Sequence, residues 1–254
     1  MSIFRSFVMA FSSYSISPKS KMEKNRENCS YILLFIPLIG AIIGVCINRW
    51  GVAYPYLCNS SVLPAVFGSV LPLFLSGGAH LDGFFRTVDA LCSHKPKEGK
   101  LRILKEDSHV GYFAIIVCVI YLMVSIGVWS EMPIEGFFLL GFQYVISRSI
   151  YGLSILLNKH ADEGLADIYI PESMASRAIQ VICLLAYIAI SAFWMILINR
   201  GVGIACVVGA IATYIYYIVL AKKDFGGITE ELGGFFVTVC EVIIPIAALI
   251  RYWF

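Results

Sequence analysis

Continuous apolar runs are the feature that most limits what this chain of 254 residues can fold into. Most are about twenty residues long, which is the length that an α-helix needs to cross a bilayer. A transmembrane β-barrel would show alternating segments of about ten residues instead. With 59% hydrophobic and 14% charged residues, the chain is also too apolar for one soluble core. We therefore predict an all-α, polytopic transmembrane helical bundle, with residues 1–254 forming a single integral-membrane domain.

Seven of these runs are long enough to be membrane segments. Pro64 and Pro72 leave two alternatives for the second run, which either crosses the bilayer or dips into it and returns. A shorter apolar segment, 2–17, has Phe4 and Phe7 at helical spacing, which predicts a helix lying in the interface; an uncleaved signal is the alternative. The predicted membrane segments are 31–48, 60–76, 111–130, 136–157, 178–198, 202–221 and 233–250.

The charged residues fall mostly on one side of these segments. If the N-terminus lies inside, the inner segments hold fifteen of nineteen Lys and Arg and fourteen of seventeen Asp and Glu. Basic residues mark the cytoplasmic side, so we expect a multi-pass protein of the cytoplasmic (inner) membrane whose active site faces the cytoplasm. A net charge of +2 without a basic stripe predicts no nucleic-acid partner. The inner segments are the interfacial and cytoplasmic segment 1–30, the main insert 77–110, and the loops 158–177 and 222–232.

The main insert carries the densest group of polar residues. Gly77 and Gly78 end the second apolar run, and the residues after them have a helical pattern. Asp82, Arg86 and Asp89 are spaced to share one face of that helix. Two carboxylates facing the same way at a membrane surface suit Mg²⁺, whereas solvated ion pairs are the alternative.

A second helix is predicted after the break at 95–97. Glu106 or Asp107 on it could complete the metal site, and Lys105 or Arg102 could hold a phosphate. An ordinary salt bridge between Arg102 and Glu106 is the alternative. The sequence thus places a second group of charged residues close to the first.

A few polar residues interrupt the apolar background elsewhere. His80 is a candidate acid–base group, with a structural histidine as the alternative. Arg148, beside Ser147, lies within a predicted membrane segment, where a charge is costly unless it is paired or faces a wet cavity. Glu241 in the last segment also needs a partner, and Arg148 is the candidate if the two helices meet.

The two remaining inner loops are acidic and rich in glycine. Glu163 lies in one of them, and the pair Gly226–Gly227, which could let the backbone approach a phosphate, lies in the other. Acidic patches on one side of a membrane bundle predict metal-assisted phosphoryl transfer from a nucleotide-activated substrate.

The order and spacing of these residues resemble those of a known family, the cobalamin (5′-phosphate) synthases, also called adenosylcobinamide-GDP ribazoletransferases. In that family Asp-Gly usually stands where this chain has Asp89-Ala90, and Thr-Gly-Asp where it has Thr229-Glu230-Glu231, so that Glu231 keeps a carboxylate. The matching stretches are Phe35 to Gly40, Gly77 to Gly83, Thr87 to Ala90, Leu101 to Gly111, Ser147-Arg148, Glu163 to Leu165 and Gly226 to Thr229.

The resemblance implies a Mg²⁺-dependent transfer of the adenosylcobinamide-phosphate group from adenosylcobinamide-GDP to α-ribazole or its 5′-phosphate, with release of GMP. Further expected partners are the lipid bilayer, a second copy of the chain and other enzymes of the corrinoid pathway. A CDP-alcohol phosphotransferase, whose Asp-x2-Asp-Gly-x2-Ala-Arg run is missing here, and a membrane transporter are the alternatives.

The residue patterns and the resemblance together give three groups of expected site residues. The catalytic group is His80, Arg86, Lys105 and Arg148. The substrate-binding group is Gly77, Gly78, Ser108, Ser147, Glu163, Gly226, Gly227 and Thr229. The metal ligands are Asp82, Asp89, Glu106, Asp107 and Glu231.

Overall fold

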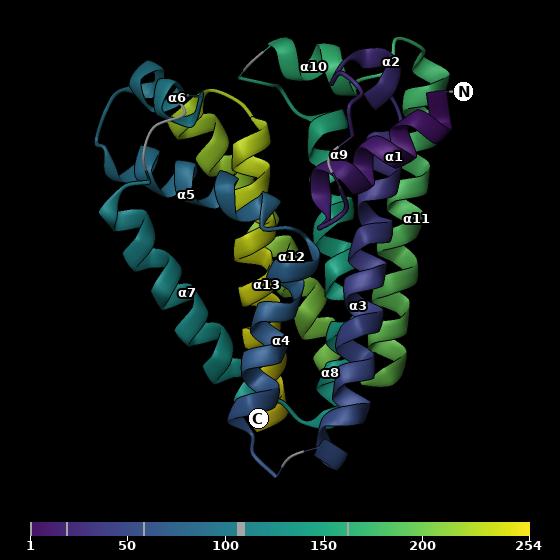
Figure 1. Ribbon diagram of the computed structural model, residues 1–254, viewed down its shortest axis with the longest axis vertical. Helices are drawn as coiled ribbons and strands as arrows, with labels where there is room; N and C mark the ends of the chain where they lie inside the picture. Colours follow the sequence, from purple (N-terminus) through teal and green to yellow (C-terminus); the bar gives the residue numbers. More distant parts are fainter. Residues whose placement is uncertain (1, 19, 58, 106–109, 162) are drawn as a thin grey trace.

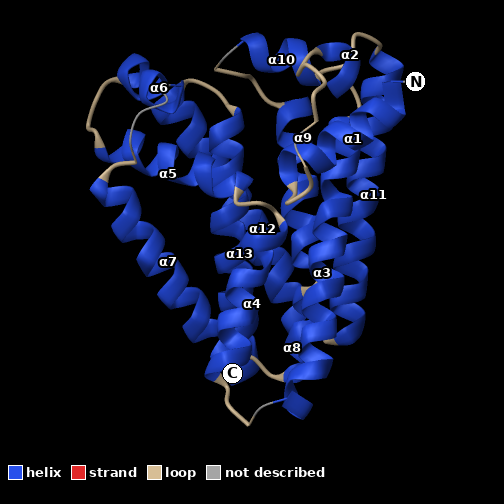
Figure 2. Cartoon of the chain, viewed as in Figure 1, coloured by secondary structure: helices blue, strands red, loops and turns tan. Residues whose placement is uncertain are grey.

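The fold is helical throughout the part of the chain that is described. The computed structural model describes residues 2–18, 20–57, 59–105, 110–161 and 163–254, with the side chains of Ser2 and Glu163 left out (Figure 1). Within these residues the only β-type contact is an isolated bridge between His160 and Ile228, and Figure 2 contains helices and loops alone. The predicted all-α class is confirmed.

Six described segments are long and apolar enough to cross a membrane. A seventh consists of α4 (Val62–Leu75) and α5 (Ala79–Cys92), which pass the same test together but are bent by 95°. The predicted polytopic membrane bundle is therefore confirmed. The six segments are α3 (Ile32–Leu57), α7 (Tyr112–Ser130), α8 (Ile134–Leu140) with α9 (Gln143–Leu157), α11 (Met174–Ile198), α12 (Arg200–Leu220) with the π-helical turn η1 (Ala221–Phe225), and α13 (Glu230–Trp253).

A bend of 95° between α4 and α5 ends the second apolar run, and both a broken span and a re-entrant segment have such a bend. Pro64 and Pro72 both lie inside α4, so the prolines do not cause the break. The break falls at Gly77 and Gly78, whose φ angles of +63° and +70° are in the left-handed region that glycine adopts without a steric penalty. The chain enters the bundle along α4 and turns aside into α5.

The short helices gather with α5 at one end of the bundle, the top of Figure 1. They are α1 (Ser2–Tyr14), α2 (Arg26–Cys29), α6 (Lys97–Lys105) and α10 (Glu163–Tyr169). Ion pairs connect segments that are distant in sequence, such as Lys100 with Asp224 at 2.5 Å and Arg26 with Glu172 at 2.5 Å. The charged segments that were predicted to share one side of the bundle therefore lie at one end of it.

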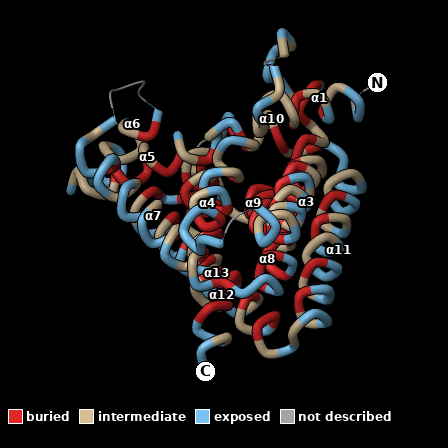
Figure 3. Tube along the Cα trace, turned by 60° about the horizontal axis from the view of Figure 1, so that its bottom comes forward, coloured by how far each residue is buried: buried red, intermediate tan, exposed pale blue. Residues whose placement is uncertain are grey.

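Helix α9 forms the centre of the bundle, and α11 lies at its edge. In the span formed by α8 and α9, 89% of the apolar window is buried, against 17% in α11 (Figure 3). Gly40 lets α3 approach α9 so closely that a Cβ atom there would overlap the Tyr144 carbonyl oxygen. Helix α11 instead exposes large apolar side chains, including Ile182 and Phe193, as expected of a helix that faces lipid.

Two helices extend beyond their predicted ends. Helix α3 continues to Leu57, beyond the predicted end of its segment at residue 48, and the Trp50 indole donates a hydrogen bond to the Pro64 carbonyl oxygen at 3.1 Å. Helix α13 begins at Glu230 instead of residue 233, because the Thr229 hydroxyl accepts a hydrogen bond from the Leu232 N–H at 3.2 Å and caps the first turn. Glu230 and Glu231 therefore belong to a helix.

Candidate active site

A cavity of about 450 Å³ opens among α1, α5, α9 and α13, at the end where the short helices gather. This volume is typical of small-molecule sites. The lining is mixed, with apolar side chains such as Met9 and Val237 beside several that can carry charge. The lining side chains that can carry charge, apart from two tyrosines, are Lys24, His80, Asp82, Arg148, Glu230 and Glu231.

Small residues bring α5 and α13 together along one wall of this cavity. A Cβ atom on Gly83 would overlap the Glu231 carbonyl oxygen, and one on Gly234 would lie 2.7 Å from the His80 carbonyl oxygen. The backbones of the two helices are thus in direct contact. Because of this contact, Asp82 from α5 and Glu231 from α13 line the same cavity although they are far apart in sequence.

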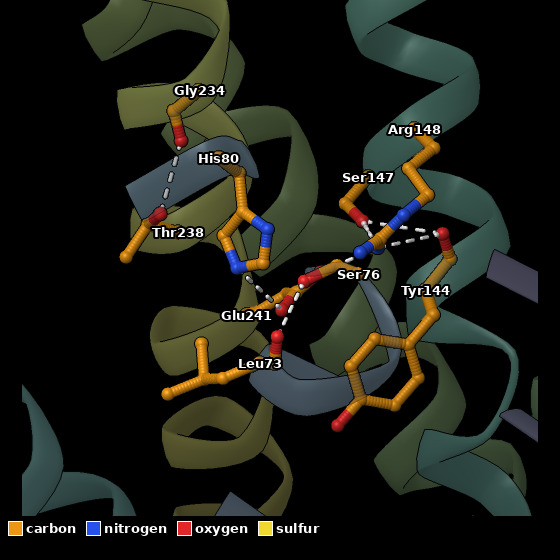
Figure 4. Close-up of polar contacts among 9 residues, drawn as sticks. All are labelled: Leu73, Ser76, His80, Tyr144, Ser147, Arg148, Gly234, Thr238 and Glu241. Atoms are coloured by element: carbon orange, nitrogen blue, oxygen red, sulfur yellow. Dashed lines mark hydrogen bonds and ion pairs between the residues drawn. The ribbon is translucent and has the colours of Figure 1, made fainter. Parts of the chain in front are cut away.

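A buried ion pair formed by Arg148, which lines the cavity, and Glu241 is shown in Figure 4, and we call this part of the cavity its floor. Nη1 of Arg148 on α9 lies 2.5 Å from Oε1 of Glu241 on α13, and the two side chains are 5% and 3% exposed. The Tyr144 carbonyl and the Ser147 hydroxyl accept further hydrogen bonds from the same Nη1, at 3.3 and 3.4 Å. The predicted pairing of Arg148 with Glu241 is confirmed. Either charge alone would be strongly disfavoured in this interior.

His80 lies beside this ion pair, at the first turn of α5. Its imidazole is 7% exposed, and Nε2 lies 4.0 Å from Oε2 of Glu241 (Figure 4). Neither of these two atoms has a hydrogen-bond partner among the described residues. His80 also lines the cavity, so the imidazole is placed between the cavity and the buried carboxylate.

Asp82 and Asp89, which were predicted to share one helix face with Arg86, have different hydrogen-bond partners in the structure. The Asp82 carboxylate accepts a hydrogen bond from Nε of Arg86 at 2.9 Å and keeps 64% of its side chain exposed. The Asp89 carboxylate accepts one from the Gly111 N–H at 2.7 Å, at the start of α7. No group of three or more potential metal-ligating side chains forms within the described ranges. Asp82 is thus hydrogen-bonded to Arg86, while Asp89 fixes the beginning of another helix.

Several other expected site residues serve the fold where the structure describes them. Gly226 has a φ of +80° and ends η1, while Gly227 packs against the backbone of residues 159–161. Thr229 is the N-cap of α13, and Lys105 is the last residue of α6; neither lines the cavity. Glu106, Asp107 and Ser108 lie outside the described residues, as does the side chain of Glu163.

The structure adds a cluster around Glu230 that the sequence reasoning missed. The Glu230 carboxylate accepts hydrogen bonds from the Tyr14 hydroxyl at 3.0 Å, the Tyr169 hydroxyl at 3.1 Å and the Lys24 ammonium at 2.6 Å. Burial above all, and then the Glu230 charge, raises the pKa of both tyrosines above its ordinary value. The only signal in the sequence was an acid directly after a helix cap, because its partners lie up to 216 residues away. The cluster ties the N-terminal segment to the edge of the cavity.

Comparison with known proteins agrees with the family that the sequence resembles. The family described as cobalamin-5-phosphate synthase matches residues 6–249. Adenosylcobinamide-GDP ribazoletransferase from Lachnoclostridium phytofermentans is 31% identical, with 98% of this chain and 95% of that protein covered. Proteins of the same name from Clostridium botulinum (strain Alaska E43) and Citrobacter koseri are 28% and 27% identical, covering 95% and 88% of this chain and 95% and 89% of their own lengths. No solved structure matches the chain. The chain belongs to the cobalamin-5-phosphate synthase family.

Proposed function

We propose that this protein transfers the adenosylcobinamide-phosphate group of adenosylcobinamide-GDP to α-ribazole or to its 5′-phosphate. The products are adenosylcobalamin or its 5′-phosphate, and GMP. The observation that carries the proposal is one cavity whose lining combines a buried arginine, Arg148, with carboxylates that include Asp82 and Glu231. The names of the related proteins supply the corrinoid and the ribazole.

The described residues fit a Mg²⁺ ion that is completed by the substrate. Mg²⁺ is usually held by one or two carboxylates, together with water and substrate phosphates. Asp82 and Glu231 line one cavity and would hold the ion, whereas the Asp89 carboxylate is engaged by the Gly111 N–H. When bound, the ion supplies positive charge that neutralises the phosphate oxygens and the leaving group.

Arg148 and His80, at the cavity floor, have different roles in the proposed reaction. Arg148 binds the phosphate that is attacked and stabilises the charge that develops on its oxygens. His80 accepts the proton of the attacking ribazole 3′-hydroxyl at Nδ1, because Nε2 faces Glu241. The new bond forms between that oxygen and the corrinoid-side phosphorus, the diphosphate bond breaks, and GMP leaves. Arg86 holds the Asp82 carboxylate in place through their hydrogen bond.

The proposal includes an orientation in the cytoplasmic membrane. The end of the bundle with the cavity carries most of the Lys and Arg residues, which favours the cytoplasmic side. Nucleotide-activated substrates would then reach the cavity directly from the cytoplasm. The apolar outer faces of helices such as α11 support an environment of lipid around the bundle.

The direct test uses the purified full-length protein in lipid nanodiscs with adenosylcobinamide-GDP, α-ribazole and Mg²⁺. We expect GMP and a cobalamin product to appear together in equal amounts. Arg148→Met should abolish this turnover, whereas Ser125→Ala, which removes a buried hydrogen bond to Ser69 away from the cavity, should not. Absence of GMP with wild-type protein, or CMP release from a CDP-activated alcohol, would count against the proposal.

A further inference from the structure

The two residues of the ion pair at the cavity floor differ in their position relative to the cavity. Arg148 is among the described residues that line the cavity, and Glu241 is not. Both side chains are almost fully buried, and their charged groups are in direct contact. The guanidinium therefore lies on the cavity side of the pair, and the carboxylate lies behind it.

The Arg148 guanidinium keeps donors that no described residue uses. Its hydrogen bonds to Tyr144, Ser147 and Glu241 all start from Nη1. A guanidinium has five N–H groups, so the three on Nε and Nη2 remain. Neither nitrogen belongs to the buried polar atoms that lack a partner, and the residue lines the cavity. These three N–H groups are available to a ligand in the cavity.

A planar group of N–H donors matches the oxygens of a phosphate, which it can bind through two parallel hydrogen bonds. Such binding needs the guanidinium to stay in one orientation. An arginine without a carboxylate at this depth would turn toward water, because an unpaired charge is costly there. Glu241 supplies the opposite charge, because its carboxylate lies 2.5 Å from Nη1, on the side of the guanidinium away from the cavity.

We propose that Glu241 is a positioning residue that orients Arg148, and that the Arg148 guanidinium held in this way binds the diphosphate group of the activated substrate. The inference rests on the proposed function for the identity of that substrate. The second carboxylate oxygen of Glu241 faces His80 Nε2 at 4.0 Å, so the same carboxylate also lies behind the proposed proton acceptor. Glu241 does not touch the substrate and acts only through these two neighbours.

The first test measures binding of inorganic pyrophosphate to the purified full-length protein, without a corrinoid. Glu241→Gln removes the charge and nearly preserves the volume. We expect it to weaken pyrophosphate binding by about tenfold or more, because the guanidinium is no longer fixed. Glu241→Asp keeps the carboxylate and should recover part of the affinity. Unchanged or tighter binding in Glu241→Gln would overturn the inference, since an added net positive charge would then matter more than orientation.

The second test separates positioning from a purely structural part in the fold. The double variant Arg148→Met with Glu241→Met replaces the ion pair by apolar side chains, which proteins often tolerate without loss of stability. We expect it to unfold near the wild-type temperature and to bind no pyrophosphate, while Ser125→Ala binds it normally. Wild-type binding by the double variant would place the anion site elsewhere and would refute the inference.

Kinetics distinguish this inference from the proposed function. If wild-type protein carries out the transfer, Glu241→Gln should raise KM for adenosylcobinamide-GDP, as the weaker pyrophosphate binding requires, and should also lower kcat by about tenfold or more; Glu241→Asp should restore part of kcat. An unchanged kcat in Glu241→Gln, together with a lower unfolding temperature, would show that Glu241 has a structural role only. If wild-type protein releases no GMP, the proposed function fails, while the pyrophosphate measurements still decide whether Glu241 orients Arg148.

Discussion

Gly83 of α5 lies so close to Glu231 of α13 that a methyl group in place of its hydrogen would overlap the Glu231 carbonyl oxygen. The contact is between two backbones, so no flexible side chain can move aside. It sets the distance between the helices that carry Asp82 and Glu231, and hence the shape of the cavity wall that they form together.

Gly83→Ala should therefore separate the two helices. We expect a loss of about 1–3 kcal/mol in the free energy of unfolding, the usual range for overpacking, together with a large loss of transfer activity. Chemical denaturation in detergent and GMP release measure the two effects. Wild-type stability and activity in Gly83→Ala would show that α5 and α13 do not pack in this way.

Gly78, at the bend between α4 and α5, can be compared with Gly127 in α7, because the two glycines differ mainly in backbone conformation. Gly78 and Gly127 both have open space where a Cβ would lie, but only Gly78 has a positive φ, of +70°. We expect Gly78→Ala to destabilise the protein by about 1–2 kcal/mol, because the left-handed conformation is strained for alanine. Gly127→Ala, within α7, should be neutral or should stabilise by up to about 1 kcal/mol. Equal effects in thermal unfolding would contradict the strain at the bend.

Asp82→Asn tests the proposed metal ligand with little change of shape. We expect GMP release to fall by about 100-fold or more, because a neutral amide holds Mg²⁺ poorly and the phosphate charge is then less well neutralised. The dependence of the residual rate on Mg²⁺ should shift to higher concentrations. Glu172→Gln is the matched control at the same end of the bundle, since its side chain is 80% exposed and forms a surface ion pair with Arg26. A normal rate in Asp82→Asn would remove this aspartate from the metal site.

The Glu230 cluster predicts a dependence of stability on alkaline pH. Burial and then the Glu230 charge raise the pKa of Tyr14 in the folded protein, while the unfolded chain keeps the ordinary value of about 10. Stability from this group is therefore fully present below about pH 10 and is lost as the pH rises further, because the unfolded state then releases the proton first. Tyr14→Phe should reduce the slope of stability against pH above that point. An identical slope in both proteins would disprove the shift.

The membrane segments could be predicted because hydropathy is a local property of the sequence. The pairing of Arg148 with Glu241 could also be predicted, since two charges inside an apolar bundle each need a partner. The bend was harder to place. The prolines drew attention to the second apolar run, yet α4 accommodates both of them, and Gly77 and Gly78 break it.

The contacts that could not be predicted join residues that are distant in sequence and individually unremarkable. Nothing near Glu230 indicates that Tyr14 and Lys24 converge on it, because α1 and α13 meet only in the tertiary structure. Asp89 seemed equivalent to Asp82 by helical spacing, but its carboxylate lies beside the Gly111 N–H. The spacing of residues along one helix predicts which of them share a face. It does not predict which neighbouring element will form a hydrogen bond with each side chain.

The shortness of α4 has a consequence for the depth at which reactants would bind. Its 14 residues rise roughly 21 Å at about 1.5 Å each, less than the bilayer's hydrocarbon thickness of about 30 Å. The turn into α5 therefore lies below the level where the longer helices leave the lipid, and α4 continues from it to the opposite end of the bundle (Figure 1). Ser76, Ala79 and His80, at this turn and just after it, line the cavity. Reactants bound there would therefore be held at a depth within the hydrocarbon layer instead of at the surface of the bilayer.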